Sequence, residues 1–190
     1  MGDFEDLLET LKKTAAVLRD ADVPFLLGGG LAAWARGGPE TEHDLDLMVK
    51  PRDAERALQA LADAGFRTGN PPEDWLFKAW DGDILVDIIF RPSGGEVDDA
   101  MFGRAEELGV QAVRMEVMSL EDVMATKLLS LHEHEVDYEN VLEIARALRE
   151  QIDWDDVRRR TRTSPYARAF FYLAEELGIL RLPSAAAGEA

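Results

Sequence analysis

The sequence predicts an α+β fold, in which helices flank a mixed β-sheet and a helical part follows the sheet. Up to about residue 118, runs with the two-residue period of strands lie between segments with helical periodicity. From Ser119 onward the periodic segments have helical spacing. The chain has 190 residues, 46% of them apolar, which is enough to bury a hydrophobic core. We therefore predict an α/β core over residues 1–118, a helical C-terminal part over 119–182 and a flexible tail over 183–190.

The elements of the core follow from these periods and from the residues between them. Apolar side chains at helical spacing mark a first helix that begins near Phe4. A proline at the start marks the helix that begins at Pro51. The turn Asp81-Gly82-Asp83 between two apolar runs indicates a hairpin. In chain order we expect a helix at 4–21, a strand at 24–28, a turn from Gly28 to Gly30, a helix at 31–35, a strand at 43–50, a helix at 51–65, strands at 75–80 and 84–90, and a strand at 110–119.

The helical part is predicted from its capping residues. Ser119 is expected to cap the first helix, with Asp122 three residues later as in a capping box. Ser164 and Pro165 suit the start of the last helix, and Gly178 suits its end. The expected helices cover residues 119–131, 137–151, 153–161 and 164–178.

The composition restricts the class of protein. The formal net charge is −17, from 38 acidic and 21 basic residues, and such a charge repels nucleic acid at long range. Because the chain has no cysteine, disulfides and thiolate chemistry are excluded. The first residues, MGDFEDLLETLKK, do not have the pattern of a signal peptide, and the apolar runs are shorter than the about 18 residues of a membrane span. We therefore expect a cytoplasmic protein without a membrane partner.

Two aspartates stand in the alternating run HDLDLMVK. In a strand, Asp44 and Asp46 share one face, roughly 6.5–7 Å apart, while the leucines share the other face. Two carboxylates at this spacing can hold one or two divalent ions. The alternative is an edge strand on which both aspartates are simply exposed to solvent.

A third aspartate, Asp87, is the polar residue in the apolar strand ILVDIIF. An unpaired buried carboxylate is costly, so Asp87 is expected to face a site. A neighbouring strand lies about 4.8 Å away, so Asp87 can complete a cluster of three carboxylates with Asp44 and Asp46. The alternatives are that Asp87 caps a loop or pairs with an arginine such as Arg91.

A glycine turn precedes the second helix in LLGGGLAA. Backbone N–H groups at such a turn suit phosphate groups. The Gly-Lys-Ser/Thr of a Walker A loop is absent. A dinucleotide-binding fold would place Gly28, Gly30 and Ala33 after a strand, with an acid such as Asp46 about 20 residues later. The second aspartate on the same face, Asp87 and the following hairpin all argue against that fold.

These residues together resemble the polymerase-β-like nucleotidyltransferase superfamily. The resemblance rests on Leu27-Gly28-Gly29, Asp44-Leu45-Asp46 and Asp87, and it covers residues 20–90 well. The later segments LEDVMATKLLSL and DYENVLEIARAL are similar to small bacterial members, including toxins of type IV toxin–antitoxin systems and antibiotic nucleotidyltransferases. The resemblance implies a nucleotidyltransferase-type mixed sheet and an enzyme that moves NMP from an NTP to an acceptor hydroxyl group with release of pyrophosphate.

The resemblance also implies roles for individual residues. Asp44, Asp46 and Asp87 would be the catalytic and metal-binding residues and would hold two Mg²⁺ ions, with Asp87 as a general base. Gly28, Gly29 and Lys127 would bind the triphosphate of the NTP, with Lys127 contributed by the helical part. The chain departs from the family pattern at Gly29, where many relatives have serine, and at Glu42, where many have threonine or serine.

The acceptor and partners are less defined by the sequence. A small molecule such as an antibiotic, a tRNA end and a protein side chain all offer a suitable nucleophile, and a cognate antitoxin is a possible partner. The arginine run Arg158–Arg162 could bind RNA or the triphosphate, or neutralise nearby carboxylates such as Asp153, Asp155 and Asp156. The alternative functions are a catalytically silent binding module and a dinucleotide-binding oxidoreductase.

Overall fold

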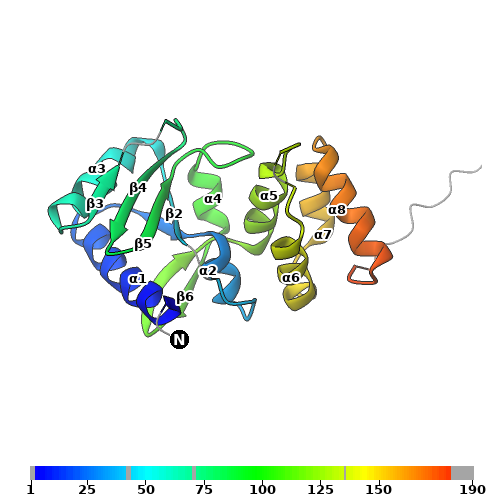
Figure 1. Cartoon of the computed structure of the whole chain (residues 1–190), viewed down its shortest axis with the longest axis horizontal. Coiled ribbons are helices and arrows are strands. Elements are labelled where there is room, and N and C mark those ends of the chain that lie inside the picture. The colour runs from blue at the N-terminus through cyan, green and yellow to red at the C-terminus, as the bar shows by residue number, and fades with distance from the viewer. Residues whose placement is uncertain (1–2, 42–43, 70–71, 135, 181–190) are drawn as a thin grey trace, which may run out of the picture.

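A computed structural model describes residues 3–41, 44–69, 72–134 and 136–180 of the chain. Within these residues seven strands form one sheet in the order β3-β4-β5-β2-β1-β7-β6 (Figure 1). The strands are β1 (Phe25–Leu27), β2 (Asp44–Val49), β3 (Arg67–Gly69), β4 (Leu76–Asp81), β5 (Ile84–Ile89), β6 (Glu106–Val110) and β7 (Val113–Val117).

Eight helices accompany this sheet in the part of the chain that the structure describes. Figure 1 shows α5 to α8 together at one end of the molecule, while α1 and α3 lie against the sheet at the other end. The helices are α1 (Asp3–Asp20), α2 (Gly29–Trp34), α3 (Pro51–Asp63), α4 (Asp99–Arg104), α5 (Leu120–Ser130), α6 (Glu139–Leu148), α7 (Trp154–Thr161) and α8 (Pro165–Glu176).

The sheet is mixed, as the sequence predicts. Strand β2 pairs with β5 in parallel and with β1 in antiparallel orientation, while β4 and β5 form the expected hairpin. This antiparallel β1–β2 pair excludes a dinucleotide-binding βαβ unit at the glycine turn, because that unit requires parallel strands. The predicted α+β fold is therefore confirmed.

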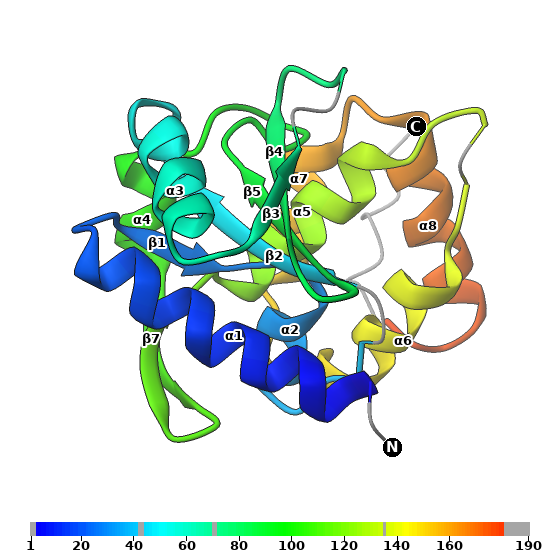
Figure 2. The same ribbon diagram turned by 60° about the vertical axis from the view of Figure 1, so that its left-hand side comes forward.

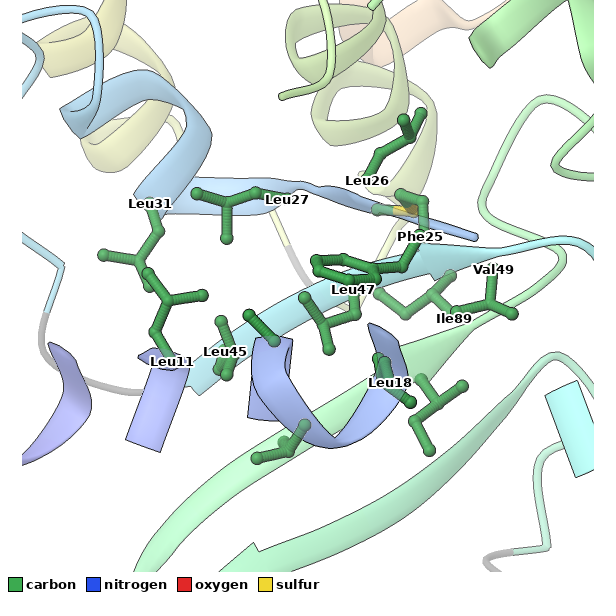
Figure 3. Packing of buried hydrophobic residues seen from close by; sticks show 14 of the residues in the cluster. Leu11, Leu18, Phe25, Leu26, Leu27, Leu31, Leu45, Leu47, Val49 and Ile89 are labelled. Atoms are coloured by element: carbon green, nitrogen blue, oxygen red, sulfur yellow. The ribbon is translucent and has the colours of Figure 1, made fainter. Parts of the chain in front are cut away.

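The two faces of β2 have different environments. Leu45, Leu47 and Val49 are fully buried on the face covered by α1. Figure 3 shows Leu11 of α1 next to Leu45, and Figure 2 shows α1 and α3 running across the same side of the sheet. Because side chains alternate along a strand, this packing fixes the other face as the one that carries the aspartates.

The helical part has a hydrophobic cluster of its own. Fully buried Phe170 of α8 lies at its centre and contacts the rings of Tyr138, Trp154 and Phe171. Helix α5 packs against α7 and α8 on this side and against α2 on the side of the sheet. The predicted division at residue 118 stays a prediction, and the predicted tail at 183–190 lies outside the described residues.

A buried carboxylate connects α5 to its neighbours. Asp122 is fully buried, and it accepts hydrogen bonds from Arg104 of α4, Arg160 of α7 and the hydroxyl group of Ser119. Burial alone would raise the pKa of Asp122, but these three donors hold it below its ordinary value. Ser119 caps α5 as predicted, through a bond from the Asp122 N–H group.

The predicted strand at 110–119 is confirmed only in part, because β7 occupies Val113–Val117 and the segment is not one continuous strand. The chain instead makes the hairpin of β6 and β7, with Gln111 and Ala112 in the turn at φ values of 48° and 65°. A turn of this kind usually contains glycine or asparagine, so the sequence gives no indication of it. The sequence also gives no indication of β3 and α4, and it places Gly29 and Gly30 in a separate turn although they begin α2.

Candidate metal and nucleotide site

Three aspartates from two strands come together on the face of the sheet opposite α1. Asp44 and Asp46 lie on β2, and Asp87 lies on β5 directly across from Asp46 in the parallel register. One carboxylate oxygen of each residue lies within 4.8 Å of one oxygen of each of the others. The cluster of three carboxylates predicted from strand geometry is therefore present, and carboxylate oxygens in such a group are the ligands that Mg²⁺ and Ca²⁺ prefer.

The Asp87 carboxylate is buried without a complete set of partners. Asp87 is only 7% exposed, and its Oδ1 atom accepts no hydrogen bond from the described residues. Burial raises the pKa of Asp87 to about 6, the charge of Lys78 opposes this rise, and the charges of Asp44 and Glu73 add to it. An orphaned buried oxygen of this kind is costly unless a cation completes the site.

Asp46 is the most perturbed member of the cluster. Burial raises its pKa to about 7, and the neighbouring Asp44 carboxylate adds to the rise. The ammonium group of Lys127 acts in the opposite direction, and Asp87 contributes a further smaller rise. The described residues therefore hold three mutually repelling carboxylates whose negative charge the nearby lysines offset only in part.

The glycine turn lies directly against this cluster. The N–H group of Gly28 donates a hydrogen bond of 2.9 Å to the backbone oxygen of Asp46. Gly29 has a φ of +55°, and a Cβ atom at this position would lie 1.6 Å from Asp46 Oδ2. Only glycine fits here, because any side chain would collide with the carboxylate and would also disfavour this backbone conformation. In this chain the contact therefore favours glycine at position 29.

Two lysines, Lys127 and Lys78, lie near the cluster. Lys127 comes from α5, and its charge lowers the pKa of Asp46, so it lies near enough to act on this carboxylate. Lys78 lies on β4 across from Asp87, and its Nζ atom is 3.9 Å from Asp87 Oδ1.

The sequence contains the information needed to find Lys78, which was not among the predicted site residues. The hairpin turn at Gly82 and Asp83 pairs Asp81 with Ile84, and counting back along both strands places Lys78 opposite Asp87.

The alternatives for Asp87 do not fit the structure. Arg91 makes ion pairs with Asp74 and Glu96, and it donates a hydrogen bond to the backbone oxygen of Asp74, so it is not a partner of Asp87. Asp87 lies in the middle of β5 and caps no loop. Glu42, the other departure from the family pattern, lies outside the described residues.

Comparisons with known proteins agree with this geometry. Residues 6–177 match the model of a family described as "Uncharacterised nucleotidyltransferase". No curated protein matches the chain.

None of the described helices is long and apolar enough to cross a membrane.

Two solved structures of the antibiotic-resistance factor ANT(2'')-Ia share the fold. The complex with adenylyl-2''-tobramycin has a TM-score of 0.62 at 18% identity, covering 87% of this chain and 97% of that one. The solution structure has a TM-score of 0.64 at 18% identity, covering 90% and 96%. The lincosamide antibiotic adenylyltransferase LnuA, with lincomycin bound, has a TM-score of 0.52 at 14% identity, covering 72% and 92%. At these identities the likeness shows a shared fold.

Proposed function

We propose that the chain transfers NMP from an NTP to an acceptor hydroxyl group in a reaction that requires Mg²⁺. The chain belongs to the nucleotidyltransferase family whose model its sequence matches. Pyrophosphate is the second product. The observation that carries the proposal is the cluster of Asp44, Asp46 and Asp87, in which oxygens from all three lie within 4.8 Å of one another. The sequence match supports nucleotidyl transfer in general, and the carboxylates support the metal dependence.

The cluster fits a divalent metal by the chemistry of its donors. All three donors are carboxylates, and the buried Oδ1 of Asp87 accepts no hydrogen bond from the described residues. When bound, Mg²⁺ would neutralise charge that develops on the attacking and leaving oxygens of the transferred phosphoryl group. Asp44 and Asp46 would hold the ion that carries the NTP, and Asp87 would complete the second position.

Asp87 is also the proposed general base. A base with a pKa near the working pH is the most effective, and the value of about 6 for Asp87 is closer to neutral pH than that of an ordinary aspartate. Asp87 would accept the proton of the acceptor hydroxyl group at a carboxylate oxygen. Lys78, at 3.9 Å from Oδ1, would keep this carboxylate ionised between turnovers.

The triphosphate is proposed to lie between the glycine turn and α5. Gly28 and Gly29 bring backbone rather than side chains up to the cluster, so N–H groups at the start of α2 would face the phosphate oxygens. Lys127 of α5 would contact the triphosphate, and its charge already acts on Asp46. The lysine would then neutralise charge on the leaving pyrophosphate.

The acceptor is proposed to be a small hydroxyl-bearing molecule. The structures that share the fold include one with adenylyl-2''-tobramycin and one with lincomycin. A net charge of −17 disfavours the approach of a large polyanion such as tRNA, and it favours a neutral or cationic acceptor. A protein acceptor and a cognate antitoxin stay predictions.

The test is a transfer assay that detects the adduct itself. The protein is incubated with each of the four NTPs and Mg²⁺ in the presence of tobramycin, lincomycin or tRNA, and products are measured by mass spectrometry and pyrophosphate release. We expect one of the acceptors to gain one NMP in the presence of Mg²⁺. We expect no transfer in EDTA and no transfer by the Asp87→Asn variant. Binding of NTP without transfer to any acceptor would favour a catalytically silent binding module. Failure to bind any NTP would refute the proposal.

A further inference from the structure

The arginine run Arg158–Arg162 is divided between two surfaces by the geometry of α7. Arg160 makes ion pairs with buried Asp122 of α5 and with Asp156 of its own helix α7. Arg159 also pairs with Asp156. These two arginines neutralise carboxylates, as one interpretation of the sequence expects. The remaining arginines of the run, Arg158 and Arg162, face the opposite way, toward α8.

A cavity lies between α7 and α8 on this second surface. Its volume is about 340 Å³, which is within the range of sites for small ligands. It shares no residue with the aspartate cluster, the glycine turn or Lys127. Its wall is formed by Arg158, Thr161, Arg162, Arg168, Phe171, Tyr172 and Glu175.

The cavity is locally basic in a strongly acidic chain. Glu175 already pairs with Arg158. Among the described residues, no carboxylate lies within 4.0 Å of the side-chain nitrogens of Arg162 or Arg168. Arg168 donates a hydrogen bond of 3.0 Å to the backbone oxygen of Arg162, which holds the two residues together. Arg162 and Arg168 therefore bring positive charge to the cavity wall without an acidic partner among the described residues, and an anion from outside would complement it.

Aromatic side chains form the rest of the wall. The Phe171 ring is buried, and the guanidinium carbon of Arg158 lies 4.7 Å from its centre. Tyr172 is 68% exposed and also lines the cavity, so its ring is accessible to a ligand there. A planar ring can stack on an exposed tyrosine, while guanidinium groups bind phosphate through paired N–H donors.

We infer that the α7–α8 cavity is a second binding site, which takes a nucleoside phosphate. Arg162 and Arg168 would bind the phosphate group, and Tyr172 would stack on the base. The nucleoside phosphate can be a free nucleotide or one unit of single-stranded RNA, and the net charge of −17 favours the free nucleotide. This site is independent of the proposed transfer reaction, because it contains no metal-binding carboxylate group and requires no divalent ion.

The experiment measures binding to the full chain in EDTA, so that the aspartate cluster cannot bind a metal–nucleotide complex. The probes are AMP, a short oligoadenylate and inorganic phosphate. Isothermal titration calorimetry measures the binding of each probe. The test variants are Arg162→Ala combined with Arg168→Ala, and Tyr172→Ala. The α6 double variant, Arg146→Ala combined with Arg149→Ala, is the matched control, because it removes the same charge from an exposed position on α6 and from the exposed residue that caps its C-terminus. Asp46→Asn is a further control, because it alters the aspartate cluster and leaves the residues of the α7–α8 cavity unchanged.

The inference predicts saturable AMP binding in EDTA that Asp46→Asn and the α6 double variant retain. Removing both arginines should weaken AMP binding by about tenfold or more, since each loses a hydrogen bond to a charged group. Removing Tyr172 should weaken AMP but not inorganic phosphate. Much tighter binding of oligoadenylate than of AMP would identify RNA as the source, and similar affinities would identify free nucleotide.

Three results would overturn the inference. They are the absence of saturable AMP and oligoadenylate binding in EDTA, equal losses in the α7–α8 and α6 double variants, and inorganic phosphate binding as tightly as AMP. None of these results would bear on metal-dependent transfer at the aspartate cluster.

Discussion

In the absence of metal, the aspartate cluster should destabilise the folded protein. Burial and the Asp44 carboxylate raise the pKa of Asp46 from 3.8 to about 7. A folded-state pKa above the unfolded value means that stability is fully present below pH 4 and is lost as the pH rises through about 7. At about 1.4 kcal/mol per pH unit, the difference of about 3 units makes the ionised carboxylate cost on the order of 4 kcal/mol at pH 8.

Replacing Asp46 with asparagine removes this charge. In EDTA at pH 8, Asp46→Asn should therefore be more stable than wild type, by up to about 10 °C in melting temperature for a domain of this size. The advantage should shrink at pH 5, where the wild-type carboxylate is protonated. Addition of Mg²⁺ should stabilise wild type and have little effect on the variant.

The assay is thermal unfolding followed by circular dichroism at pH 5 and pH 8, with EDTA or Mg²⁺. Asp83→Asn is the matched control, because it removes one negative charge from an exposed turn on the same sheet. The control should melt at nearly the wild-type temperature at both pH values. If Asp46→Asn melts below wild type in EDTA at pH 8, the ionised Asp46 carboxylate stabilises the folded protein, and the predicted cost of its charge is refuted.

Three other perturbations follow from the same geometry. Lys78→Met removes a charge that lowers the pKa of Asp87, so the acid limb of the pH–rate profile should move to higher pH; an unchanged profile would exclude Asp87 as the base. Gly29→Ala forces a Cβ into the carboxylate of Asp46 at a positive φ, so Mg²⁺-dependent stabilisation by NTP should be lost; its retention would contradict this packing. Asp122→Ala leaves Arg104 and Arg160 without their buried partner, so it should lower the free energy of unfolding in urea by about 3 kcal/mol. A loss below about 1 kcal/mol would show that the two arginines do not depend on this carboxylate.

Most of the candidate site could be predicted because it depends on local alternation. The period of β2 places Asp44 and Asp46 on one face, since their leucine neighbours require the core. Asp87 is the polar residue in a buried strand, which marks it without knowledge of the tertiary structure. The register of the hairpin would also have placed Lys78 beside Asp87, because the turn fixes which residues pair.

The parts that could not be predicted depend on contacts that are distant in sequence or on unusual turns. The parallel contact of β1 with β7 joins Leu27 to Val117, and no local pattern encodes it. The turn at Gln111 and Ala112 lacks glycine, so the sequence predicts one strand at 110–119 and gives no indication of β6 or of its hairpin with β7. The division of the arginine run between Asp122 and the α7–α8 cavity depends on how α7 packs on α5 and α8.

The central claim is that the three aspartates bind an NTP through Mg²⁺. The most direct measurement is the melting temperature of wild type and Asp46→Asn with each of the four NTPs, with Mg²⁺ and with EDTA. A ligand that binds only the native state must raise this temperature. We predict that at least one NTP stabilises wild type in Mg²⁺ beyond the effect of Mg²⁺ alone, and that Asp46→Asn lacks this gain. If no NTP stabilises wild type in Mg²⁺, or if Asp46→Asn responds equally, the account is contradicted.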